Sequence, residues 1–245
     1  MSVAYRKTAF SLIELLVVIA IIGLLAAILV PALLKCRAGA HRVECTSNLR
    51  QLGLAAQLYW DDHEGAAFRY RSGATDDGDL YWFGWIQRGS EGERRMDHRQ
   101  GALYPYLTAR GVEICPSLRY ASSDFKLKAT GAAYGYGYNL HLSPASSKPA
   151  VNIHTIPHAS DTVLFADAGQ VNTFQAPASP EHPMLEEFYY LNAFEPTTHF
   201  RHRDRANGVF CDGHVEALSP VLGSLNTRLP QEILGRLPKE ILLVP

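Results

Sequence analysis

Histidine and aspartate side chains gather toward the carboxyl-terminal end of the chain, where the sequence contains His199, His202, Asp204, Asp212 and His214. Two imidazoles and a carboxylate are ligands that zinc accepts. His202, Asp212 and His214 would form such a metal set if the chain turned back between them. The alternative is structural, with Asp212 in a turn, His202 bonded to the backbone and His214 in a strand. We favour the structural interpretation and expect no cofactor, with a bound metal as the alternative.

Other catalytic patterns are absent from the sequence. It contains no G-x-S-x-G or H-E-x-x-H motif and no glycine-rich phosphate loop, which mark several large enzyme classes. The aromatic-glycine run from Tyr134 to Leu142 is more typical of a strand than of a ligand-stacking surface. We therefore expect that the protein is not an enzyme.

The cysteines and the charge exclude two further classes. Cys36, Cys45, Cys115 and Cys211 include no C-x-x-C pair, which argues against a zinc ribbon. Two of them could form a disulfide in an oxidising compartment, but the sequence by itself leaves the pairing open. The formal net charge of −1 gives no basic signature for nucleic acid, so no nucleic-acid partner is expected.

The segment from Leu12 to Leu34 has one charged residue, Glu14. A helix of this length is about 35 Å long, which is enough to cross the hydrocarbon core of a membrane. Its 16 Leu, Ile and Val residues contribute roughly −5 to −10 kcal/mol to insertion, against about 2.5–3.5 kcal/mol for a central acidic residue. Membrane insertion is therefore predicted despite Glu14.

The residues before this segment suggest a reason for the carboxylate. A cleaved secretory signal fits poorly, because the apolar run is too long and the small residues lie before it, in K-T-A-F. A cut between Ala9 and Phe10 would expose the α-amino group of Phe10, four residues before Glu14. An opposite charge offsets much of the cost of an ion in lipid. The amine of the same or a neighbouring copy would therefore suit Glu14, which predicts an assembly contact.

The run KTAFSLIELLVVIAIIGLLAAILVPAL closely resembles the processing signal of type IV pilins and type II secretion pseudopilins. The resemblance implies that a membrane prepilin peptidase cuts between Ala9 and Phe10 and N-methylates Phe10. It also implies that Glu14 registers one subunit against the next, and that Gly23 and Pro31 are positions that loosen the helix. Ala9 replaces the glycine that the family prefers before the cut, which implies slower cleavage.

Three further pieces resemble one pilin-like subfamily. They are CTSNLRQLGLAAQLY from Cys45, CPS from Cys115, and His202 followed by nine residues and then Asp212-Gly213. Cys45 and Cys115 lie in two of these pieces and form the expected disulfide. It would close a loop of about 70 residues and contribute on the order of 4 kcal/mol. Two buried thiols are the alternative.

A single helix is predicted to continue from the apolar segment to about Asp62. One apolar stripe is expected at Val43, Leu49, Leu52, Ala56 and Tyr59. Gly39 and Gly53 each cost about 1 kcal/mol, and Pro31 should kink the helix rather than end it. Two helices joined near Gly39 are the alternative.

Beyond Gly65 the sequence changes to short strand-like runs separated by Gly, Pro, Asn and Ser. The expected strands are Leu80–Ile86, Gly111–Cys115, AYGYGYN, DTVLFADAG and the pair GVFCDGHVEAL. Asp212-Gly213 predicts a two-residue type I′ hairpin in that pair, and the tail from Leu222 is expected to form short helical turns. The predicted fold class is α+β, with one long helix packed on a mainly antiparallel sheet. The expected segments are a leader (1–9), a transmembrane and assembly helix (10–34), its amphipathic continuation (35–62) and a globular domain (63–245).

The resulting hypothesis is a structural subunit that assembles with copies of itself or with other pilin-like subunits. Its further partners would be the prepilin peptidase, an assembly platform and the bacterial inner membrane, which it spans once with its globular domain in the periplasm or outside the cell.

Some pseudopilins bind calcium through carboxylates near the sheet, which makes Asp167 and Asp212 candidates, although no EF-hand pattern is present. The alternatives are an anchored binding protein that does not polymerise and a membrane-tethered metallohydrolase using His202, Asp212 and His214. The sequence leaves open whether the filament is a pilus or a secretion pseudopilus.

Overall fold

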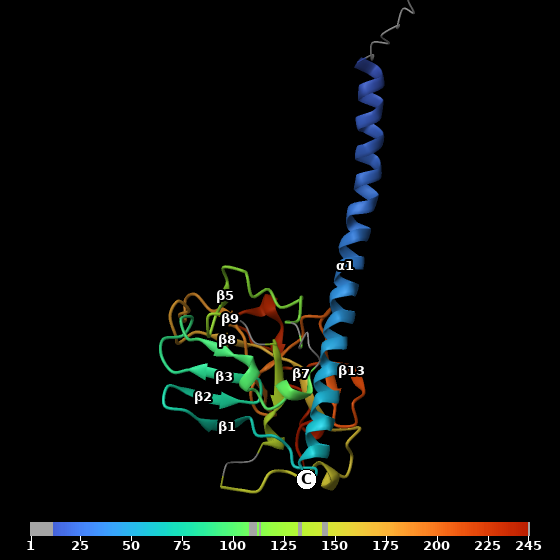
Figure 1. Ribbon diagram of the computed structural model, residues 1–245. Coiled ribbons are helices and arrows are strands. Elements are labelled where there is room, and N and C mark those ends of the chain that lie inside the picture. The colour runs from blue at the N-terminus through green and yellow to red at the C-terminus, as the bar shows by residue number, and fades with distance from the viewer. Residues whose placement is uncertain (1–11, 108–111, 113, 132–133, 144–146, 245) are drawn as a thin grey trace, which may run out of the picture. The chain divides into compact units, whose positions relative to one another are not determined.

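The computed structural model describes residues 12–107, 112, 114–131, 134–143 and 147–244 of the 245-residue chain (Figure 1). The chain divides into two compact units, Met1–Ala40 and His41–Pro245. The first unit contributes the beginning of a long helix, and the second contains the sheets and the core.

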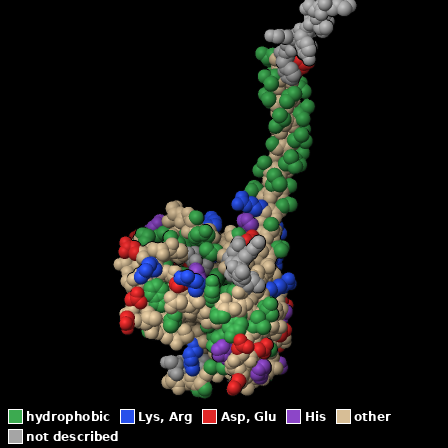
Figure 2. All heavy atoms as spheres, in the orientation of Figure 1, with side chains coloured by type: hydrophobic (Ala, Val, Ile, Leu, Met, Phe, Trp, Pro, Cys, Tyr) green, Lys and Arg blue, Asp and Glu red, His purple; other side chains and the backbone are tan. Residues whose placement is uncertain are grey.

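One α-helix, α1, extends over Leu12–Asp62 (Figure 1). The prediction of one continuous helix is therefore confirmed, and the alternative of two helices joined near Gly39 is wrong. Every residue from Leu12 to Ala40 is exposed, and Figure 2 shows hydrophobic side chains over this part of α1. By length and composition the helix could cross a membrane, because such a surface needs an apolar environment.

The part of α1 in the second unit buries one face against the sheets. The buried residues are Cys45, Asn48, Leu49, Leu52, Gly53, Ala55, Ala56 and Trp60. The predicted stripe is wrong at Val43, which is 71% exposed, because a spacing of six residues places Val43 on a different side of the helix from Leu49. A Cβ atom on Gly53 would lie 2.8 Å from Val209 Cγ2, so glycine permits a close approach of the helix to the sheet.

The central sheet of the second unit has the strand order β10-β6-β7-β12-β13. Its strands are β6 (Tyr136–Asn139), β7 (Val163–Asp167), β10 (Tyr190–Leu191), β12 (Ala206–Phe210) and β13 (Val215–Leu218). All neighbours are antiparallel except β10 and β6. Every residue of β7 and β12 is buried, because hydrophobic clusters cover both faces of these strands. The central strands therefore read as continuous apolar runs rather than as alternating ones.

Three smaller sheets surround the central one. The first sheet contains β1 (Arg71–Ala74), β2 (Gly78–Tyr81), β3 (Gly84–Gln87) and β4 (Met96–Asp97). The second sheet contains β5 (Phe125–Lys126), β9 (Met184–Glu186) and β8 (Gln170–Asn172). The third sheet contains β11 (Thr198–His199) and β14 (Leu234–Gly235). Among these pairs only β5 and β9 are parallel. The predicted α+β class with a mainly antiparallel sheet is confirmed.

Short 3-10 helices connect the strands. They are η1 (His98–Gln100), η2 (Tyr104–Tyr106), η3 (Leu140–Leu142), η4 (Ile153–Thr155), η5 (Pro230–Glu232) and η6 (Lys239–Ile241). The helical turns predicted in the tail are present as η5 and η6, and strand β14 lies between them.

The prediction of one strand over Leu80–Ile86 is wrong. The structure has a hairpin there, with Trp82 and Phe83 between β2 and β3 and Tyr81 paired with Gly84. Trp82 and Phe83 are each 1% exposed. The run is apolar because its turn is buried in the core, so hydrophobicity alone could not locate the turn. The described residues of 111–115 form no strand either.

The hairpin between β12 and β13 has a different turn from the predicted type I′. The backbone N–H of Phe210 donates to the carbonyl of His214, and that of Gly213 donates to the carbonyl of Phe210. Gly213 has a φ of +92°, whereas Asp212 is not among the residues with positive φ. A type I′ turn needs positive φ at both central residues, so this is a three-residue turn closed by a left-handed glycine.

Candidate functional site

The amino-terminal part of α1 carries the residues predicted for assembly. Ala9 and Phe10, the predicted processing site, lie outside the described residues. Glu14 is an exposed carboxylate in the first turn of α1, where the helix dipole favours negative charge. Among the described atoms beyond the helix's own backbone, none lies within 4 Å of a Cβ built on Gly23, and Pro31 is also exposed. These three positions therefore lie on a surface that another helix could contact.

The second candidate site is a buried group of polar side chains around Asp167, which we call the Asp167 cluster. Arg201 Nη2 donates to Asp167 Oδ1 at 2.8 Å, and the backbone N–H of Asn207 donates to Oδ2 at 2.6 Å. His202 Nε2 lies 3.4 Å from the same Oδ2 atom. The three side chains of Asp167, Arg201 and His202 are at most 3% exposed. Burial by itself would raise the pKa of Asp167, but Arg201, His202 and Asn207 hold that pKa below its usual value.

The guanidinium of Arg201 connects the ends of several elements. It donates from Nη2 to the carbonyl of Gly135, at 2.5 Å, and from Nη1 to the carbonyl of Ala168, at 3.0 Å. These carbonyls lie just before β6 and just after β7. A planar fork with several N–H donors suits such a set of acceptors, so Arg201 fixes the chain around the end of the central sheet.

A disulfide joins Cys45 of α1 to Cys115, which is the pairing expected from the sequence. Both residues are fully buried. Arg201 Nε lies 3.4 Å from Cys115 Sγ, and His202 Nε2 lies 3.6 Å from it. The disulfide therefore borders the Asp167 cluster directly, with two of its nitrogen donors beside one sulfur.

The structure does not bring His202, Asp212 and His214, the alternative metal set, together. His214 Nδ1 lies 2.6 Å from Asp212 Oδ1, and both side chains are 39% exposed, whereas His202 is buried beside Asp167. Within the described part of the chain, the group of metal-ligand atoms that comes together is Cys45, Cys115 and His202. Its two sulfurs form a disulfide and are not thiolates, so this donor set does not fit a metal.

The calcium hypothesis also fits the geometry poorly. Both oxygens of Asp167 already accept hydrogen bonds from Arg201 and Asn207, and a guanidinium occupies the place that a cation would take. Asp212 is paired with His214 in an exposed turn. Neither carboxylate is gathered with further oxygen ligands in the way that calcium requires.

A surface hollow of about 290 Å³ lies next to the Asp167 cluster. Its lining includes Arg203, Asp204 and Ile233, which have φ values of 56°, 61° and 42°. They are three of the four non-glycine residues with positive φ among those the structure describes. Such conformations cost about 1–3 kcal/mol each and concentrate at functional sites, so the hollow is a candidate binding place.

His199 lies at the wall of this hollow and is buried. Burial lowers the pKa of His199 to about 4, although Glu232 opposes the shift. His199 Nε2 is 3.6 Å from Glu232 Oε2, and Arg119 Nη2 is 2.5 Å from Glu232 Oε1. The wall of the hollow therefore presents a neutral imidazole and a paired carboxylate.

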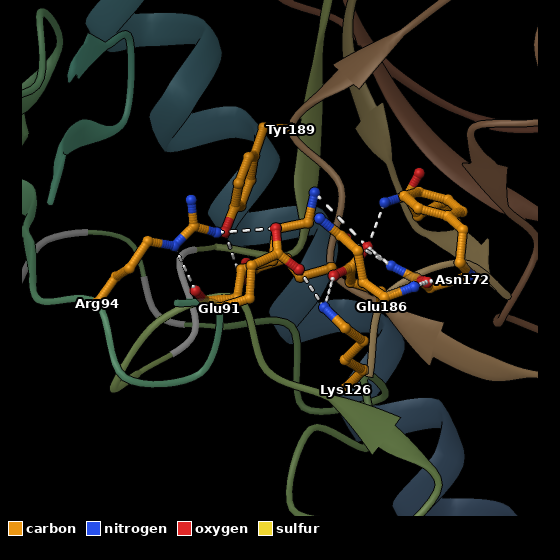
Figure 3. A network of polar contacts seen from close by, with 11 residues as sticks. Glu91, Arg94, Lys126, Asn172, Glu186 and Tyr189 are labelled. Carbon is orange, nitrogen blue, oxygen red and sulfur yellow. Dashed lines mark hydrogen bonds and ion pairs between the residues drawn. The ribbon is translucent and has the colours of Figure 1, made fainter. Parts of the chain in front are cut away.

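A second buried charge cluster surrounds Lys126 (Figure 3). Lys126 Nζ contacts the carboxylate of Glu91 and lies 2.7 Å from Glu186 Oε1. Asn172 Nδ2 donates to Glu186 Oε2 at 3.1 Å, and Arg94 is paired with Glu91. Lys126 and Glu186 are at most 1% exposed. Lys126 and Glu186 face each other across the parallel pair β5 and β9, so the cluster ties one edge of the second unit together.

Sequence reasoning missed both the role of Arg201 and the Lys126 cluster. Arg201 directly precedes the motif residue His202, which was the available signal, but Arg203 and Arg205 follow closely and look the same in the sequence. Nothing in the sequence around Lys126 distinguishes it from a surface lysine. Its burial depends on strands that are far apart in the chain.

Comparison with known proteins bears on the amino-terminal helix. A family model described as the prokaryotic N-terminal methylation motif matches residues 5–30. The chain is type IV pilin-like at its amino-terminal end. The type IV major pilin protein PilA of Myxococcus xanthus (strain DK1622) is 39% identical over 59 residues, which is 24% of this chain.

The similarity is confined to part of both chains. The aligned region spans 27% of the length of PilA, and no solved structure matches the chain significantly. The pilin-like identity therefore rests on the methylation motif and the long apolar helix, whereas the globular unit is described from its own geometry.

Proposed function

We propose that the protein is a structural subunit of a type IV pilus or of a type II secretion pseudopilus. The observation that carries the proposal is the exposed apolar surface of α1 from Leu12 to Leu34, in the segment that overlaps the methylation motif. A helix that is apolar all round is suited to lipid before assembly and to packing among other helices after it. The similarity to a major pilin supports the same role.

In this proposal a membrane prepilin peptidase cuts between Ala9 and Phe10 and N-methylates Phe10. The new amine of Phe10 and the carboxylate of Glu14 then set the register between neighbouring helices. Charge pairing in an apolar surrounding is strong and directional, so it specifies one register among many similar apolar contacts. Gly23 and Pro31 would allow the packed helices to adjust.

Substitution of Glu14 by alanine tests the register contact. The Glu14→Ala subunit should still insert, since removing a charge makes insertion easier, but filaments should be lost or strongly reduced. Mass spectrometry of the native amino terminus measures processing, and electron microscopy with cross-linking in membranes measures assembly. Glu44→Ala is the matched control, because Glu44 is an exposed carboxylate on the same helix.

Three results would contradict the proposal. They are a native protein that keeps its first nine residues, normal filaments from Glu14→Ala, and loss of filaments in both variants alike. The first concerns processing, and the other two concern the specific role of Glu14.

The hollow beside Arg203 and Ile233 favours a second candidate function, an anchored protein that binds a ligand without polymerising. Three strained residues at one hollow are the observation behind it. Cross-linking separates the two functions, because contacts between copies near Phe10 are expected for a filament and not for a solitary anchored protein.

A further inference from the structure

The two sulfurs of the disulfide have different surroundings. Cys115 Sγ is within 3.4 Å of Arg201 Nε and within 3.6 Å of His202 Nε2. For Cys45 Sγ, no hydrogen bond to another side chain is found among the described residues. The hydroxyl of Tyr136 donates to the backbone carbonyl of Cys45 at 3.5 Å, and a ring nitrogen of His202 lies within 4.8 Å of Cys45 Sγ. The two ends of the bond are therefore electrostatically unequal.

This asymmetry matters when the bond opens. A disulfide sulfur accepts hydrogen bonds weakly, whereas a thiolate is an anion that N–H donors and nearby positive charge stabilise strongly. Asp167 holds both side chains, because its Oδ1 accepts a hydrogen bond from Arg201 and its Oδ2 lies 3.4 Å from the same His202 Nε2 atom that faces Cys115. The donors are thus held in place before any charge develops on Cys115.

We propose that the Cys45–Cys115 bond is a thiol–disulfide exchange site, in which an external thiolate attacks Cys45 and Cys115 leaves as a stabilised thiolate. In this step a sulfur–sulfur bond forms between the external thiol and Cys45, and the Cys45–Cys115 bond breaks. The electron pair of the broken bond remains on Cys115. A second external thiol can then release Cys45, so that the protein gains two thiols and the external thiols become one disulfide.

His202 acts as a positioning residue in this step, together with Arg201. The titratable and charged groups that face Cys115 are Arg201, His202 and, behind them, Asp167. In this arrangement the motif residue His202 has a role that does not depend on the Asp212-Gly213 turn. Exchange would remove the covalent link between α1 and Cys115 within the second unit, while the packing of α1 through Leu49 and Leu52 remains.

The experiment measures which of the two sulfurs the external thiol attacks. Both sulfurs are buried, so a thiol reaches them only through local opening, and the opening rate affects attack on either sulfur equally. Oxidised full-length protein in detergent is treated with reduced glutathione and quenched with acid at early times. Peptide mapping by mass spectrometry then measures the ratio of glutathione adducts at Cys45 and Cys115. We expect about tenfold or more glutathione adducts on Cys45 than on Cys115, because attack at Cys45 releases the better stabilised thiolate.

His202→Gln replaces the rigid imidazole beside Cys115 Sγ by a flexible amide. We expect it to reduce the preference for Cys45 at least about threefold. His214→Gln is the matched control, because His214 belongs to the same sequence motif but is exposed and paired with Asp212, and it should leave the ratio unchanged. The wild-type measurement needs no variant, so the test stands even if His202→Gln folds poorly.

Several outcomes would overturn the inference. They are equal adducts at both cysteines, a preference for Cys115, or an unchanged ratio in folded His202→Gln. Absence of any adduct in the folded protein, when the denatured protein reacts at both cysteines, would show an inert structural disulfide. The inference does not rest on filament assembly, so either proposal can fail without the other.

Discussion

His202 Nε2 lies 3.4 Å from Asp167 Oδ2, so the motif histidine is the partner of a carboxylate at the end of β7. The other end of the motif, Asp212-Gly213, forms the turn between β12 and β13. The nine residues between His202 and Asp212 therefore separate two different structural roles. One role fixes a buried polar cluster, and the other closes an exposed hairpin.

Substitution of Asp167 by asparagine should strongly destabilise the second unit. Asparagine keeps the shape of the side chain but leaves Arg201, 3% exposed, as an uncompensated buried charge, which costs about 3–5 kcal/mol. Urea unfolding of the full chain in detergent, followed by tryptophan fluorescence, measures the change. Asp212→Asn is the control and should change the free energy of unfolding by less than about 1 kcal/mol, because its ion pair is exposed. Similar values for the two variants would contradict the buried ion pair.

Stability should depend on pH through His199. Its pKa is about 4 in the folded protein, against 6.5 for an ordinary histidine, so the unfolded state binds more protons between these values. Stability is therefore complete above about pH 6.5 and is lost as the pH falls toward 4, by up to about 3 kcal/mol for a difference of about 2.5 units. Thermal melting between these pH values should show a weaker dependence for His199→Gln than for the wild type. An identical slope in both proteins would exclude His199 as the source.

Removal of the buried lysine should be as costly as removal of Asp167. Lys126→Met leaves Glu186, which is fully buried, without its closest cation, with an expected loss of about 3–5 kcal/mol. Lys148→Met is the matched control at an exposed position and should stay within about 0.5 kcal/mol of the wild type. Chemical denaturation of the three proteins under the same conditions gives the comparison. A Lys126→Met protein as stable as the control would mean that the cluster contributes no net stability.

The long helix could be predicted because its signal is local. From Leu12 to Leu34 nearly every residue is apolar, and no other regular structure buries its own backbone polar groups in lipid. The exposed surface of the same residues in the structure agrees with that expectation. The strands β6, β7, β12 and β13 were also predicted, since each is a short apolar run bounded by turn residues.

The details of the turns could not be predicted in the same way. Trp82 and Phe83 form a turn inside an apolar run because the surrounding core buries them. Asp212-Gly213 is a strong turn signal, but the register of β12 and β13 adds a third residue to the loop. In both cases packing and register outweighed the local pattern.

The membrane-length helix, the resemblance of the amino-terminal run to a processing signal and the α+β class could all be predicted from the amino-acid sequence, because they depend on neighbouring residues and their hydrophobicity. Tertiary structure alone decided which partners His202, Arg201 and Lys126 have. Each partner comes from a segment distant in the chain, and a buried charge must be paired because it has lost its hydration. The placement of Cys115 between α1 and the Asp167 cluster has the same origin, since it requires the helix, the central sheet and the segment after β11 to meet.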